Sequence, residues 1–323
     1  MSHSSSGSVS SQTMTPPTSE AGPEDSRLAT LIGASAVLLW GSLALLTSLT
    51  GGRIPPFQMM SVSFGIAFVL MAIRWWLRGE SGLAYARQPR EAWLLGIAGY
   101  FGYHACYFAA MSKAPAVEVS LIAYLWPLLM VLMSTLVTGM ALHWNQIAGA
   151  LTALLGCWIL LVDGDSGFGS QYLDGYLLAL VCAFVWSGFS VLSRTMKAVP
   201  TDAAGWFCGA TAFLGCICHL LFETTVWPES LLQWLALIGL GVGPVGIAFF
   251  TWDYGTKHGN LVLLGVLSYA APLVSVLLLL LAGKGEWRLS IGVATIAIVI
   301  GAWMASRTAD KKTAAPMERP KQP

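Results

Sequence analysis

The stretch YLWPLLMVL, residues 124–132, recurs 145 residues later as YAAPLVSVL, residues 269–277. At the same offset, Gly156 and Trp158 in the first half are matched by Gly301 and Trp303 in the second. A tyrosine, a proline, a glycine and a tryptophan that repeat at unchanged spacing indicate an internal duplication rather than a shared apolar composition. The sequence therefore predicts two copies of one structural unit.

The composition predicts that this duplicated chain lies in a membrane. Of its 323 residues, 56% are hydrophobic and 10% are charged, whereas an ordinary soluble domain has about 25% charged residues. Apolar stretches of about 20 residues are long enough to cross a bilayer as helices. We expect ten such helices, near residues 28–50, 57–77, 91–111, 117–138, 146–162, 173–195, 203–223, 231–255, 260–281 and 289–307.

Five spans in each copy determine how the two copies are oriented. An odd number of crossings leaves the second copy upside down relative to the first, which is the plan of many transporters. We therefore expect an all-α integral membrane protein in which two inverted five-helix repeats, residues 27–163 and 164–307, form a basket around a central cavity.

The positions of the seventeen lysines and arginines predict the orientation of the whole chain, because positive loops stay in the cytoplasm. With the N-terminus inside, thirteen lie on the cytoplasmic side and four, Arg53, Lys113, Lys284 and Arg288, lie on the other. Both termini are therefore predicted to be cytoplasmic, in a bacterial inner membrane. Residues 1–26 and 308–323 have too little apolar content to pack and are expected to be disordered tails.

The third predicted span carries a stripe of polar rings. Tyr100, Tyr103, His104 and Tyr107 are spaced i, i+3, i+4 and i+7 and share one helical face. Such a stripe is either a packing face, with its hydroxyls bonded to neighbouring backbones, or the wall of a ligand cavity. For the set we favour a cavity wall. Its duplicate falls on the eighth span, where Trp252 stands at the position of Tyr107.

Each copy also has a proline inside a continuous apolar span. Pro127 and Pro272 lack the N–H that bonds four residues back, so the carbonyls of Ala123 and Ser268 are expected to be free and the helices to bend. At membrane depth, such carbonyls are tolerated where they are buried in protein or line a wet cavity. A kink that serves packing alone is the alternative. The flanking candidates for substrate contact are Tyr124, Trp126, Ser268 and Tyr269.

Two tryptophans lie deep within the first and sixth spans. Trp40 and Trp186 are 146 residues apart and lie away from the span ends, where anchoring aromatic residues are found. They are either large core residues or platforms for a ligand that carries a ring or a positive charge.

Few ionisable groups lie within the spans. Asp253 precedes Lys257 by four residues, so an i,i+4 ion pair is the favoured interpretation and a proton-carrying role is the second. His104 is the other candidate for proton coupling, because imidazole titrates near neutral pH. Cys216, Cys218 and His219 do not have the spacing of a metal site. We expect no metal and no cofactor.

Several of these features together resemble the EamA-type families of the drug/metabolite transporter superfamily over nearly all of residues 28–307. The resemblance is carried by Trp40-Gly41-Ser42, by Lys113-Ala114-Pro115-Ala116, by the paired prolines Pro127 and Pro272, and by Gly156 and Gly301 in the closing helices. Within that superfamily, Tyr124-Leu125-Trp126-Pro127 and the polar stripe most resemble the YddG group of aromatic amino-acid exporters. The resemblance implies a ten-helix basket whose central cavity opens alternately to either side.

The sequence thus favours export of aromatic and other neutral amino acids by alternating access, with the lipid bilayer as surroundings. The alternatives are another small metabolite or drug, such as a purine, a nucleoside or a lipophilic cation, and then an intramembrane enzyme, for which no nucleophile or acid pair is evident. Proton exchange and facilitated diffusion both stay open. The net charge of +1 implies no nucleic-acid partner. We expect a monomer or a weak homo-oligomer.

Overall fold

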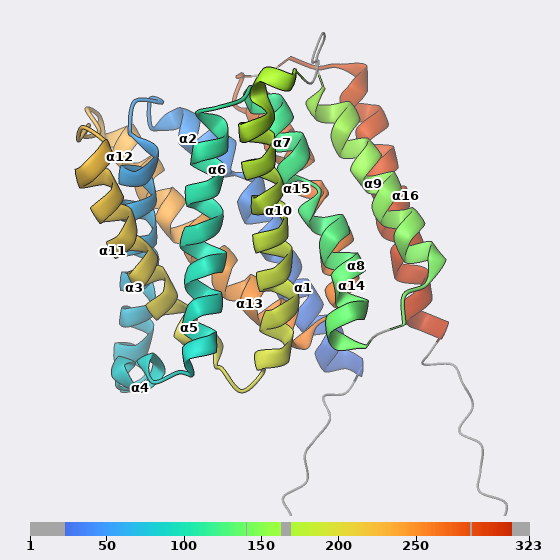
Figure 1. The fold of residues 1–323 in the computed structure, drawn as a ribbon, viewed down its shortest axis with the longest axis horizontal. Coiled ribbons are helices and arrows are strands. Elements are labelled where there is room, and N and C mark those ends of the chain that lie inside the picture. The colour runs from blue at the N-terminus through green and yellow to red at the C-terminus, as the bar shows by residue number, and fades with distance from the viewer. Residues whose placement is uncertain (1–22, 140, 163–168, 285, 312–323) are drawn as a thin grey trace, which may run out of the picture.

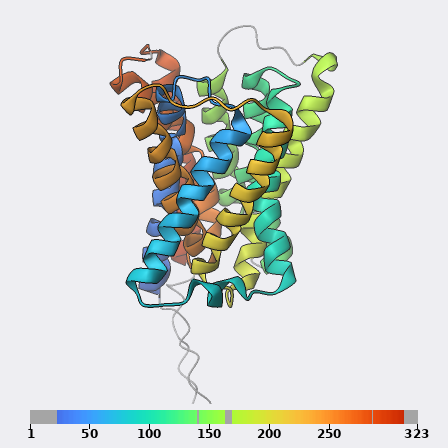
Figure 2. The same cartoon turned by 90° about the vertical axis from the view of Figure 1, so that its left-hand side faces the viewer.

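The computed structural model describes residues 23–139, 141–162, 169–284 and 286–311. These residues form helices that run alongside one another between two ends of the molecule, where the connections gather (Figures 1 and 2). This described part of the chain contains no β-strand. The first helix begins and the last helix ends at the same end of the bundle (Figure 1).

The helices fall into two series. The first is α1 (Pro23–Gly41), α2 (Leu43–Leu49), α3 (Pro56–Leu77), α4 (Gly82–Ala86), α5 (Arg90–Ile97), η1 (Ala98–Gly102), α6 (Tyr103–Met111), α7 (Ala116–Ala123), α8 (Trp126–Thr138) and α9 (Trp144–Leu161). The second is η2 (Ser170–Tyr172), α10 (Leu173–Ser193), η3 (Arg194–Met196), η4 (Thr201–Ala203), α11 (Ala204–Phe222), α12 (Leu231–Leu240), η5 (Gly241–Ile247), α13 (Ala248–His258), α14 (Leu261–Leu267), α15 (Ala270–Leu281) and α16 (Leu289–Lys311). Helices α1 and α16 each extend a few residues into the predicted tails, whose remaining residues lie outside the described part.

Among the described residues, nine helices are long and apolar enough to cross a membrane. They are Glu24–Leu49, Pro56–Leu77, Ala116–Val137, Trp144–Leu161, Ser170–Met196, Thr201–Phe222, Leu231–His258, Leu261–Leu281 and Leu289–Arg307. They coincide with nine of the ten expected spans. The chain is therefore an integral membrane protein.

The remaining expected span, residues 91–111, is helical from Arg90 to Met111 but is not among these nine. It contains α5, η1 and α6, and it carries the whole polar stripe. Three tyrosines and a histidine lower its mean hydropathy below that of its neighbours. The residues that make this helix a candidate for function are therefore the ones that weaken its membrane signature.

A π-helical turn interrupts the third span of the first half and its counterpart in the second. The first turn is η1, residues 98–102, and the second is η5, residues 241–247. Adding the repeat offset of 145 to the first turn gives residues 243–247, which lie within the second. Turns of this kind are rare and often occur at functional sites. Both halves therefore share a local irregularity as well as a sequence pattern.

Both proline-containing spans break where the sequence predicts. Helix α7 ends at Ala123 and α8 begins at Trp126, while α14 ends at Leu267 and α15 begins at Ala270. The expectation of a free Ser268 carbonyl is wrong, because this oxygen accepts a hydrogen bond from the N–H of Ala271 at 3.1 Å. A tighter i to i+3 turn replaces the bond that Pro272 cannot make.

Helices α9 and α16 lie against each other through small residues. A Cβ atom added to Gly149 would lie 2.5 Å from the carbonyl oxygen of Gly301, and one added to Gly301 would lie 2.5 Å from that of Gly149. A Cβ on Gly156 would lie 3.0 Å from the carbonyl oxygen of Ala294. At the offset of 145, Gly156 corresponds to Gly301 and Gly149 to Ala294, so the two close approaches are counterparts of each other.

Candidate functional site

Four tryptophans from both halves of the chain meet inside the bundle. Trp40 lies at the end of α1, Trp126 at the start of α8, Trp186 in α10 and Trp252 in α13. The ring centroid of Trp40 is 6.4 Å from Trp126, 5.6 Å from Trp186 and 5.0 Å from Trp252. The tilted and edge-on arrangements of these rings are favourable ones. We call these four residues, with Tyr103 and Phe249, the aromatic cluster.

The remaining members of the aromatic cluster close it from the third span of each half. Tyr103 in α6 lies 5.5 Å from Trp186, and Phe249 in α13 lies 5.4 Å from the same ring. Trp126, Trp186, Trp252 and Phe249 are at most 6% exposed. Trp40 and Tyr103 are half-buried, so the accessible edge of the cluster lies on these two residues.

Two indole groups of the aromatic cluster are held by hydrogen bonds. Nε1 of Trp40 donates to the carbonyl oxygen of Pro244 at 3.1 Å, within the π-helical turn η5. Nε1 of Trp252 donates to Oγ of Ser190 at 3.1 Å. Because these donors are occupied and Trp252 is fully buried, the half-buried indole of Trp40 is the one that offers a ligand its ring face and edge.

The polar stripe of α6 follows the predicted helical face. Tyr103 and Tyr107 are stacked 6.0 Å apart, and His104 lies 5.2 Å from Tyr103. Nδ1 of His104 contacts the carbonyl oxygen of Tyr100 at 2.6 Å, and because a carbonyl only accepts, this nitrogen carries the proton. In the neutral ring, Nε2 is then a hydrogen-bond acceptor. The hydroxyls of Tyr107 and Ser120 are 3.3 Å apart.

The break between α7 and α8 sends its two flanking aromatic residues to different places. Trp126 enters the aromatic cluster, whereas Tyr124 packs against a second core cluster that includes Val131, Ala150 and Tyr269. In the aromatic cluster, Trp126 contacts three other rings, those of Trp40, Trp186 and Trp252. Tyr124 therefore lies outside the aromatic cluster.

Ser268 and Tyr269 have their polar groups engaged within the fold. The hydroxyl of Tyr269 accepts a hydrogen bond from the N–H of Leu128 at 3.1 Å, and the side chain is fully buried. Oγ of Ser268 donates to the carbonyl oxygen of Leu264 at 2.8 Å. Leu128 follows Pro127, so the second half supplies a group that stabilises the broken helix of the first.

The ion pair between Asp253 and Lys257 forms as the sequence predicts, but it is buried. Nζ of Lys257 lies 2.8 Å from Oδ2 of Asp253, and each residue is 4% exposed. Thr201 donates its hydroxyl to the same carboxylate oxygen at 2.7 Å, and Lys257 also donates to the carbonyl oxygen of Val199 at 2.9 Å. The pair therefore links α13 to the connection between α10 and α11.

Glu223, one of the few charged residues within or near the predicted spans, organises the opposite end of the bundle. Its carboxylate accepts hydrogen bonds from the N–H groups of Phe57 and Gln58 at 2.9 and 3.0 Å and so caps the start of α3. It also lies 2.9 Å from Nδ1 of His219. The described residues contain no group of three or more potential metal ligands. In the sequence, the i,i+4 spacing of His219 and Glu223 is the feature that indicates their contact.

Comparisons with known proteins agree with this architecture. The model of the EamA-like transporter family matches residues 27–162 and 173–307, one match in each half. The aromatic amino acid exporter YddG of Ancylobacter novellus is 49% identical over 280 residues, which cover 86% of this chain and 96% of that protein. The protein of the same name from Escherichia coli (strain K12) is 27% identical and covers 76% and 86% of the two chains.

A more distant relative and a solved structure complete the comparison. The biotin transporter of Salmonella typhimurium is 28% identical over 179 residues, 54% of this chain and 57% of that one. A crystal structure that is 48% identical superposes with a TM-score of 0.83 and covers 88% of this chain and 99% of the other. These relatives are transporters or exporters rather than enzymes. With both halves matched, the chain belongs to the EamA-like transporter family.

Proposed function

We propose that this protein exports aromatic amino acids across a bacterial inner membrane. The observation that carries the proposal is the aromatic cluster, in which Trp40 and Trp186 from the two halves lie 5.6 Å apart beside Tyr103. A substrate ring that inserts between such faces gains about 1 kcal/mol for each aromatic contact. The 49% identity to an aromatic amino acid exporter supports the same substrate class.

The polar stripe beside the aromatic cluster supplies groups for the amino-acid head. Nε2 of neutral His104 accepts a hydrogen bond from the substrate ammonium, and the hydroxyls of Tyr103 and Tyr107 donate to its carboxylate. Trp40, at the accessible edge of the aromatic cluster, holds the ring together with Trp126, Trp186 and Trp252 behind it. Tyr124, Ser268 and Tyr269 stabilise the helices around this site, at the breaks that Pro127 and Pro272 introduce.

Transport proceeds by alternating access between two inverted five-helix repeats in a ten-helix bundle. Three observations support this arrangement: the counterpart contacts of α9 and α16, the π-helical turns at equivalent positions, and the helical third span from Arg90 to Met111. Arg74, Arg78 and Arg194 lie toward the end where α1 begins and α16 ends, which supports placing both termini in the cytoplasm. A monomer is sufficient for this mechanism.

The test is flux through the pure protein in liposomes. Labelled phenylalanine and tryptophan are expected to equilibrate at least ten times faster than in empty liposomes, and threonine and a nucleoside more slowly than either. Equal rates for all four compounds, or no flux above empty liposomes, would remove the aromatic amino acids as substrates. Faster flux of the nucleoside would indicate a different small metabolite as the substrate. The relatives named biotin transporters are similar to this chain and carry the name of such a metabolite.

A further inference from the structure

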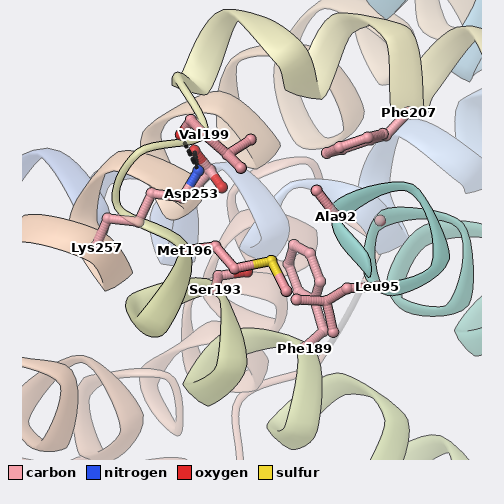
Figure 3. A pocket seen from close by; sticks show the side chains of 10 residues that line it. Ala92, Leu95, Phe189, Ser193, Met196, Val199, Phe207, Asp253 and Lys257 are labelled. Carbon is pink, nitrogen blue, oxygen red and sulfur yellow. Dashed lines mark hydrogen bonds and ion pairs between the residues drawn. The ribbon is translucent and has the colours of Figure 1, made fainter. Parts of the chain in front are cut away.

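A small cavity lies between the two halves of the chain, beside the buried ion pair (Figure 3). Ala92 and Leu95 of α5 line it from the first half, and Phe189 of α10, Met196 of η3 and Phe207 of α11 line it from the second. Asp253 and Lys257 form part of its wall. All of these residues lie in the half of the bundle that contains the end proposed to face the cytoplasm.

This cavity adjoins the aromatic cluster. The ring of Phe189 lies 5.3 Å from Trp186 and 5.2 Å from Tyr100. Tyr100 in turn lies 4.6 Å from Phe249 of the aromatic cluster. Ala92, Phe189 and Phe207 are at most 6% exposed, so the cavity is closed in this structure. A substrate ring would pass from one of these aromatic contacts to the next only after α5 and α10 separate.

The buried ion pair is present in one half of the duplicated chain. At the repeat offset of 145, Asp253 corresponds to Phe108 and Lys257 to Ser112. The fold of the unit therefore does not depend on these charges. A buried ion pair adds little stability over apolar residues of similar size, because both charges must be desolvated. Its presence beside a cavity favours a functional explanation.

The chemistry of the cavity wall is complementary to that of the proposed substrate. An aromatic amino acid carries an ammonium and a carboxylate next to a ring, and this wall presents a carboxylate and an ammonium next to Phe189 and Phe207. When the substrate ammonium replaces Lys257 on Asp253, Lys257 is released to pair with the substrate carboxylate. A compound with one charge would leave either Asp253 or Lys257 buried without a partner, which is costly.

From this complementarity, and resting on the proposed function, we propose that Asp253 and Lys257 form an inner recognition site at which a zwitterionic substrate exchanges partners with the ion pair before it reaches the aromatic cluster. This inner recognition site therefore tests both charges of the substrate before the polar stripe contacts them, whereas the aromatic cluster selects for the ring. The exposed pair of Arg53 and Glu229, with side chains 75% and 72% exposed, provides a matched control far from this cavity.

The experiment measures how well unlabelled phenylalanine, phenethylamine and phenylpropionate inhibit uptake of labelled phenylalanine by the full-length protein in liposomes. In the wild type, phenylalanine is expected to act at concentrations at least tenfold lower than the two singly charged compounds. In the double variant Asp253→Asn, Lys257→Met this difference should shrink at least threefold, and the intact polar stripe should account for the preference that is left. The exchanged variant Asp253→Lys, Lys257→Asp should restore part of it, and Arg53→Gln, Glu229→Gln should leave it unchanged.

A double variant that keeps the tenfold preference would overturn the inner recognition site while leaving the proposed function intact. A wild type without phenylalanine flux would overturn the proposed function itself. If the double variant folds but transports too slowly to measure, the same three compounds are compared by the shift that each produces in the melting temperature of the purified protein. A retained tenfold difference in the concentration needed for that shift would again contradict the site.

Discussion

Trp40 and Trp186, which occupy matching positions in the two halves of the chain, are in direct contact, with ring centroids 5.6 Å apart and planes inclined by 74°. A duplicated residue that meets its own copy lies close to the boundary shared by the two halves. Any relative movement of the halves therefore changes this contact. In a transporter that alternates between two conformations, a substrate bound here would contact both halves at once.

Replacing Trp40 with leucine should slow phenylalanine transport about fivefold, because loss of one ring contact costs the bound substrate about 1 kcal/mol and 1.4 kcal/mol corresponds to tenfold in affinity. Initial rates in liposomes, corrected for the amount of inserted protein, measure the effect. Trp158→Leu serves as the control, because this tryptophan of α9 is 40% exposed and lies outside the aromatic cluster. Equal rates for the two variants would argue against a substrate contact at Trp40.

The close approach of α9 and α16 predicts that Gly301→Ala destabilises the protein. The new Cβ would lie 2.5 Å from the carbonyl oxygen of Gly149, and backbone there must move. Overpacking of this kind costs about 1–3 kcal/mol. Gly292→Ala in the same helix has no atom within 4 Å of its new Cβ, and it should be neutral or stabilising by up to about 1 kcal/mol. Thermal unfolding in detergent compares the two, and an equal melting temperature would contradict the observed packing.

Tyr269→Phe should destabilise the broken helix of the first half. Without the hydroxyl, the N–H of Leu128 loses the acceptor it has at 3.1 Å, and a buried donor left without a partner costs about 1–3 kcal/mol. Tyr254→Phe removes a hydroxyl from a tyrosine that is 38% exposed and should have little effect. The comparison uses thermal unfolding at neutral pH. No difference between these variants would mean that water replaces the lost bond.

A hydrogen bond in the connection between α3 and α5 should make the stability of the protein depend on pH. The hydroxyl of Tyr85 donates to Glu80 at 2.5 Å, and this hydrogen bond lowers the pKa of the Glu80 carboxyl. A carboxyl with a lowered pKa contributes stability above its unfolded-state pKa, and the contribution is lost as the pH falls through the folded-state value. Wild type should therefore melt above Tyr85→Phe at pH 7, and the gap should close at pH 3. A gap independent of pH would assign the effect to packing alone.

Local properties of the sequence were sufficient to predict nine of the membrane spans and the two helix breaks. The spans follow from apolar length, and the breaks follow from the missing N–H of Pro127 and Pro272, both of which are local properties. The break between α1 and α2 at Ser42 was not predicted. The repeat does not indicate it, because Gly188, which matches Ser42 in the second half, lies in the unbroken helix α10. There, a Cβ on the adjacent Gly41 would clash with Val274 of α15, so tertiary packing decides that geometry.

The candidate site was predicted less completely. The stripe of Tyr103, His104 and Tyr107 follows from helical spacing, but the placement of Trp126 and Tyr124 on different clusters depends on how the chain turns between α7 and α8. The free Ser268 carbonyl was predicted from the general behaviour of proline in helices. A local turn that reaches Ala271 supplies the missing hydrogen bond.

Alternating access is the central claim, and reciprocal labelling of two engineered cysteines tests it most directly. In a background without the native cysteines, Met111→Cys at the end of α6 and Ser193→Cys in the cavity beside Asp253 and Lys257 report on opposite sides of the aromatic cluster. Adding phenylalanine should change their rates of reaction with a membrane-impermeant thiol reagent in opposite directions. Rates that rise together, fall together or stay unchanged in a protein that transports phenylalanine would contradict the account.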